Sequence, residues 1–139
     1  MHTNLTAIQD ALVTAIAAQT GCRVSLGYPL KGTLSEDVWV GIDARMSVTD
    51  EMTGYCERTE SAEVPVFVWV EKTGGTPKAT RDRAFALMED IEDALAADRT
   101  LGGICESASV SGFETDYSYT EKSVQVGIAV RIAVESTVV

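Results

Sequence analysis

Apolar side chains recur at helical spacing in the first part of the chain. Between Thr3 and Thr20 they fall on one stripe of a helix, which Thr3 or Asn4 would cap and Gly21 would end. The stripe consists of Leu5, Ile8, Leu12 and Ile16. This spacing predicts an amphipathic helix that packs on a core.

A second helical stretch runs from about Pro77 to Asp98, with Thr76 as its cap and proline in its first turn. Its buried stripe comprises Ala84, Leu87, Met88, Ile91 and Leu95. The opposite face is acidic toward the end of the helix, where the helix dipole favours cations. Either this face serves something outside the helix or it is an ordinary solvated face.

Between and after the helices, apolar positions alternate as in strands. Val38–Met46 alternates, the polar stretch Ser47–Gly54 suits the tip of a long hairpin, and Tyr55–Val70 would return. After the Gly102-Gly103 break, Ile104–Gly112 predicts a weaker strand.

The last strand has the clearest pattern of all. Val124–Val134 alternates strictly, after a polar, tyrosine-bearing connector at Glu114–Lys122. The side chains expected inside are Val124, Val126, Ile128, Val130, Ile132 and Val134. The order of elements predicts one α+β domain over residues 1–139, with a mainly antiparallel sheet, two helices on one face and a long β-hairpin.

The charge narrows the choice of partners. Among 139 residues, 21 are acidic and 11 are Lys or Arg, which gives a net charge of −10. A free-standing nucleic-acid binder needs a basic surface, and so does a protein that binds an anionic membrane surface. The acidity serves either solubility or a surface that stays near a polyanion without adhering to it. No apolar run reaches the length of a membrane span.

The sequence offers little to an enzyme or a metal site. Cys22, Cys56 and Cys105 are far apart and lack zinc-ligand spacing, so free thiols are expected. His2 lies beside the initiator methionine, where it cannot support a nucleophile. Asp50 and its acidic neighbour lack the further oxygens of a calcium loop. We therefore expect no catalytic activity and no cofactor.

Two surfaces are unusually free of charge. The first helix presents a smooth face formed by Ala7, Ala11, Thr14 and Ala18. Such a face permits close approach, either within the fold or by a neighbouring subunit. The stretch Val64–Val70 is apolar on both faces, with Phe67 and Trp69 opposite the valines. A strand of this kind is buried on both sides, in a central position or in an interface.

The order and type of these segments resemble the tail-terminator proteins of long-tailed bacteriophages, also called tail-completion or head–tail joining proteins. The likeness covers almost the whole chain. It rests on the first helix, the loop around Gly27-Tyr28-Pro29, the Val64–Val70 strand leading to the second helix, and the Val124–Val134 strand. A head-completion (stopper) protein of the phage neck, or a small ferredoxin-like ligand-binding domain, are the alternatives.

The resemblance implies a structural virion protein at the tail–neck junction, assembled in the bacterial host cytoplasm. Members form a ring, usually of six subunits, that ends the tail tube, meets the head-completion protein and lets DNA pass without specific binding. Its partners would be copies of itself, the major tail tube protein and the stopper. Candidates for docking to tube or neck are Val48, Asp50, Glu51, Met52, Tyr117 and Tyr119. Candidates for subunit interfaces are Ala7, Ala11, Thr14, Ala18, Phe67 and Trp69. Candidates for charges lining the lumen are Asp50, Glu51, Glu57, Glu60, Asp82, Glu89 and Asp93.

Overall fold

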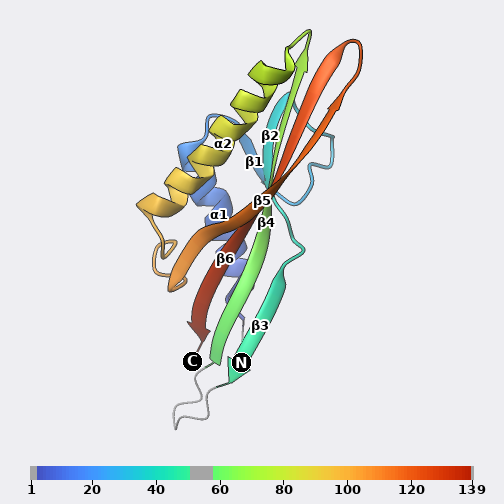
Figure 1. Ribbon diagram of the computed structural model, residues 1–139. Coiled ribbons are helices and arrows are strands. Elements are labelled where there is room, and N and C mark those ends of the chain that lie inside the picture. Colours follow the sequence, from blue (N-terminus) through green and yellow to red (C-terminus); the bar gives the residue numbers. More distant parts are fainter. Residues whose placement is uncertain (1–2, 51–57, 139) are drawn as a thin grey trace.

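The computed structural model describes residues 3–50 and 58–138. Helices α1 (Leu5–Gln19) and α2 (Pro77–Ala97) cover one face of a six-stranded sheet (Figure 1). The strands are β1 (Arg23–Leu26), β2 (Glu36–Val40), β3 (Arg45–Asp50), β4 (Arg58–Thr73), β5 (Ser107–Tyr119) and β6 (Ser123–Val138). The predicted α+β fold, with a mainly antiparallel sheet and both helices on one face, is confirmed.

The sheet is built around its two longest strands. The order is β1-β2-β4-β6-β5, and β3 pairs with the other half of the β4 edge that β2 occupies. All pairs are antiparallel except β1 with β2. The sequence analysis did not predict β1, because a strand of four residues with Arg23 and Ser25 in alternation carries little apolar signal.

The predicted strand Val38–Met46 is wrong as a single element, since β2 ends at Val40 and β3 begins at Arg45. Gly41 donates to the Pro65 carbonyl at 2.8 Å, and a Cβ on Gly41 would lie 2.7 Å from the Pro65 ring. Pro65 has no N–H to donate to a neighbouring strand. At this residue the partner of β4 changes from β3, which pairs before it, to β2, which pairs after it. Ile42, which the alternation places on the same face as Val38 and Val40, lies in the gap and is 67% exposed.

The core lies between the helices and the inner face of the sheet. The predicted inward set of β6, Val124 to Val134, is buried throughout. The predicted stripes of both helices also pack there, with Leu5 only partly buried. The valines of β4 face the helices, whereas Phe67 and Trp69 are half-buried on the outer face. The two-sided apolar character of β4 therefore reflects one face that packs under the helices and one that no helix of the described residues covers.

The predicted connector Glu114–Lys122 is wrong, because β5 continues to Tyr119. A bulge between Val110 and Gly112 lets the strand follow β6. A tight turn then closes the hairpin, in which the Thr120 amide donates to the Ser123 carbonyl at 2.9 Å. A stretch of Thr, Tyr and acidic residues is typical of an exposed strand as well as of a loop. The sequence analysis predicted a loop because the stretch is polar.

Helix α1 is held at its start by a distant carboxylate. Asn4 is the N-cap residue, but its side chain makes no cap hydrogen bond and donates instead to Ser136 at 2.9 Å. Glu60 on β4 accepts from the Asn4 amide at 3.2 Å and from the Thr3 hydroxyl at 2.7 Å. At the other end Thr20 is extended and Gly21 has no left-handed φ, so the predicted glycine cap is wrong.

Helix α2 begins as predicted, with Thr76 accepting from the Ala79 amide at 3.2 Å and Pro77 in the first turn. One ion pair ties it to the sheet. Arg83 donates to the Glu36 carboxylate through Nε at 2.7 Å and through its second nitrogen at 3.1 Å. The hydrogen bonds from Arg83 hold the pKa of Glu36 below its ordinary value.

Replacing Glu36 with Gln is expected to remove an acid-sensitive part of the stability. A lowered pKa in the folded state stabilises the protein above the carboxyl's ordinary pKa and ceases to do so as the pH falls through the lowered value. The Glu36→Gln variant should therefore be less stable than the wild type near neutral pH, by less than about 1 kcal/mol because the pair is partly exposed. Denaturant unfolding across pH 3–7 measures the difference, which should close at the acidic end. A constant difference at every pH would contradict this origin.

Candidate interaction surfaces

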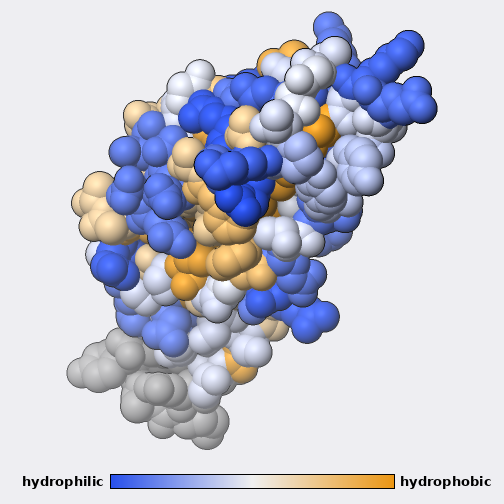
Figure 2. Space-filling model, turned by 45° about the horizontal axis from the view of Figure 1, so that its top comes forward, coloured by the Kyte–Doolittle hydropathy of each residue, from blue (hydrophilic) through white to orange (hydrophobic). Residues whose placement is uncertain are grey.

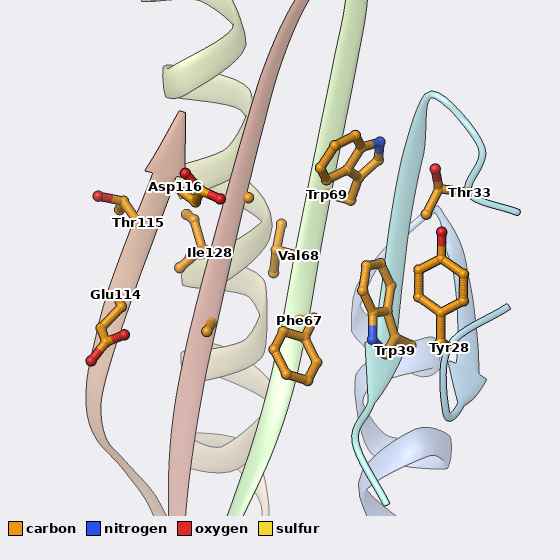
Figure 3. A pocket seen from close by; sticks show the side chains of 12 residues that line it. Tyr28, Thr33, Trp39, Phe67, Val68, Trp69, Glu114, Thr115, Asp116 and Ile128 are labelled. Atoms are coloured by element: carbon orange, nitrogen blue, oxygen red, sulfur yellow. The ribbon is translucent and has the colours of Figure 1, made fainter. Parts of the chain in front are cut away.

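A groove runs along the outer face of the sheet, opposite the face that α1 and α2 cover (Figure 3). Rings from β2, β4 and the loop after β1 form one wall: Trp39 and Phe67 stack at 5.5 Å between centroids, and Tyr28 meets Trp39 edge-on at 5.3 Å. Trp69 extends this wall toward the hairpin end. The cluster is an apolar surface of the kind that marks interaction sites.

The opposite wall of the groove is acidic. Glu114 and Asp116 lie on β5, and Gly127 and Ala129 of β6 form part of the lining between the two walls. Glu114 is paired with Arg131 at 3.3 Å, whereas Asp116 has no ion pair within the described residues. Aromatic faces beside the Asp116 carboxylate suit a partner that presents a cation.

The interface candidates Phe67 and Trp69 therefore lie together in this groove. Tyr28 and Trp39 belong to the same site, although the sequence analysis did not select them. A signal existed for Trp39, which alternates with the buried Val38 and Val40 and so had to point outward.

Figure 2 shows one side of the molecule, where apolar surface forms a band between strongly hydrophilic flanks.

The smooth face of α1 is open to solvent in the single chain. Ala7, Thr14 and Ala18 are exposed and Ala11 is half-buried. Of the four residues, only Ala11 packs against the core within the described chain. The rest of the face is therefore free to contact a neighbouring subunit.

The docking candidates separate into two distant groups. Tyr117 and Tyr119 stand near the tip of the β5–β6 hairpin, where their rings lie 5.7 Å apart and are 45% and 69% exposed. Val48, which is exposed, and Asp50 lie on β3, at the opposite end of the sheet (Figure 1). Glu51 and Met52 lie outside the described residues, as does half of the predicted hairpin tip Ser47–Gly54, whose first four residues belong to β3 and not to a loop.

The lumen candidates do not form one surface. Glu60 is only 1% exposed and binds the start of α1, so it is not available to line a channel. Asp82, Glu89 and Asp93 are exposed on α2, but Asp82 is paired with Arg81 at 2.9 Å, which lowers its pKa. Glu51 and Glu57 lie outside the described residues. Among the described candidates, Glu89 and Asp93 remain as exposed, uncompensated acids on a helix.

The structure gives no metal site and no disulfide among the described residues. They contain no cluster of three or more His, Cys, Asp or Glu side chains that could hold a metal ion. Cys22 and Cys105 are free thiols as predicted, and burial raises the pKa of both. Cys56 lies outside the described part of the chain. No helix within the described residues is long and apolar enough to cross a membrane.

No protein-family model matches the chain, and no curated protein matches it. Among solved structures, a chain of the "Virion of native gene transfer agent (GTA) particle" is similar over 98% of this chain and 100% of its own length. The TM-score is 0.54 and the sequence identity is 14%. The likeness shows that the two chains share a fold from end to end.

Proposed function

We propose that this protein is a structural component of a virion, and more specifically a tail terminator. It forms a homo-oligomeric ring at the head-proximal end of the tail tube, ends tube polymerisation and joins the tail to the head. The observation that carries the proposal is the end-to-end likeness of fold to a chain of a gene transfer agent virion. The sequence-level resemblance to tail terminators supports the finer assignment.

The surfaces described above are compatible with such a ring. A closed ring requires two different contact surfaces on each subunit, because its interfaces are heterologous. The aromatic groove and the smooth face of α1 are two such surfaces on different elements. The tip of the β5–β6 hairpin with Tyr119 and the end of the sheet with β3 are further exposed surfaces, available to a neighbouring subunit or to the tube and neck proteins. Glu89 and Asp93 are the best remaining candidates for acidic groups that keep passing DNA from adhering.

The test is assembly of the tail tube in the presence of this protein. The major tail tube protein from the same genome is polymerised with and without the purified chain, and the products are examined by electron microscopy. We expect tubes that stop growing and carry added density at one end. Tubes that elongate unchanged, with bare ends, would overturn the assignment as a terminator. Density that instead appears on DNA-filled heads would identify a stopper.

A further inference from the structure

The most exposed part of the sheet is the free edge of β5. Its segment 113–119 is exposed at every residue and pairs only with β6 in the described structure. One row of backbone N–H and C=O groups therefore points outward, which is a template for pairing with another strand. Pro and Lys, which protect many natural edge strands, are absent from β5, whose bulge lies before this segment and whose charged residues are Glu114 and Asp116. The segment 113–119 is thus open to a partner strand whose charge matches these two residues.

The acidic side chains on this edge limit what covers it. Glu114 and Asp116 project on the outer face of the sheet, since they lie opposite Ala129 and Gly127 of β6. Two β5 strands side by side would bring four carboxylates together, which is unfavourable between directly opposed residues. Pairing of β5 with itself is therefore disfavoured, and the partner strand should carry a cation on the outer face.

We propose that strand β3 of a second copy adds to the free edge of β5. Arg45 on β3 lies opposite Glu63 on the outer face, is exposed, and forms no ion pair with a carboxylate in the described residues. In the register that sets Arg45 opposite Asp116, exposed Val48 lies opposite exposed Phe113 on the helix side of the sheet. Both faces of the joined strands are thus complementary in charge or in apolar character.

The remaining free edge, β1, suits the role less well. It has four residues, and its one cation, Arg23, is bound to the buried Asp37. By contrast β3 has six residues against the seven of the free β5 segment. The directions also agree, because successive antiparallel pairing from β3 through β4 and β6 makes β3 of the next copy run antiparallel to β5.

The geometry of this contact is staggered. β3 lies beside β4 residues 58–63, whereas the free β5 segment is level with β4 residues 66–72. With Arg45, which is level with Glu63, opposite Asp116, which is level with Trp69, neighbouring copies are offset along the strands by about six residues, or roughly 20 Å. A chain of such contacts closes into a ring only when the strands are inclined to the ring axis, as in barrels. The inference rests on the proposed ring and specifies how its subunits join.

Charge reversal tests the contact directly. Asp116→Lys and Arg45→Glu should each raise the concentration at which the oligomer forms by about tenfold or more, because each places like charges across the edge. The combination of both substitutions in one chain restores an opposite pair and should recover most of the loss. Glu89→Lys and Lys31→Glu are matched controls, since both residues are exposed on other elements and should leave assembly unchanged. Analytical ultracentrifugation measures assembly, and thermal melting confirms that each subunit folds.

Hydrogen exchange gives a readout that does not depend on register. The oligomeric wild type is compared with the monomeric Asp116→Lys variant, and amides in 113–119 and 45–50 should be protected only in the oligomer. An oligomer that leaves both strands equally exchanging would overturn the proposal. A wild type that stays monomeric at every concentration tested would also overturn it, while the tube-capping experiment independently decides the terminator role.

Discussion

Replacement of Ile128 with Asp is expected to abolish soluble folding. Ile128 is 1% exposed on β6, the strand between β4 and β5 at the centre of the core. The substitution removes a buried apolar side chain, which costs about 2–5 kcal/mol, and buries an unpaired carboxyl group in its place. Their sum is comparable to the entire stability of an ordinary domain, about 5–15 kcal/mol. Soluble yield and circular dichroism measure the loss.

The matched control is Thr115→Asp. Thr115 lies directly opposite Ile128 in the β5–β6 register, but it is exposed. The same added charge there remains hydrated, and the variant should fold and melt cooperatively close to the wild type. An Ile128→Asp protein that melts like this control would mean that the inward face of β6 has been assigned to the wrong side.

Loss of the Glu60 carboxylate is expected to have the second largest effect. The group is almost completely buried, yet it accepts from the Thr3 hydroxyl and the Asn4 amide and pairs with Arg58 at 3.4 Å. It also adds negative charge at the N-terminus of α1, where the helix dipole favours it. Glu60→Ala leaves the partly buried Arg58 and an end-of-helix donor without their acceptor, at a cost of roughly 2–4 kcal/mol.

Denaturant unfolding of Glu60→Ala at neutral pH measures this cost. Glu135→Ala is the control, because it removes the same carboxylate from an exposed position on β6. Glu60→Gln keeps an acceptor without the charge and should fall between the two. Equal midpoints for Glu60→Ala and Glu135→Ala would show that the buried carboxylate contributes nothing to holding α1 on the sheet.

The elements with many regular repeats could be predicted from the sequence. Helix α2 shows its apolar stripe over several turns, and β6 alternates without interruption, so local pattern and tertiary burial agree. The burial of Glu60 was also within reach. It shares its parity along β4 with Ala62 and Val64, which places all three on the inner face.

Other features depend on contacts that local pattern does not contain. The alternation of Val38–Met46 continues through the break because the break is imposed by Pro65 on another strand, against which Gly41 packs. The polar segment β5 forms a strand because it pairs with β6 along its whole length. The aromatic groove likewise needs the register that sets Trp39 opposite Phe67. Single-sequence periodicity identifies faces, and the register decides which faces meet.

The central position of β6 has a consequence for synthesis of the chain. This strand joins β4 to β5, yet it follows every other described element in the sequence. While the ribosome is still adding residues before Ser123, β4 and β5 have no common neighbour and the helices have no complete sheet to cover. Such long-range pairing is slow, and unpaired edges promote aggregation before it completes. The sheet can therefore be completed only after β6 has left the ribosome, and until then β4 and β5 each keep an unpaired edge.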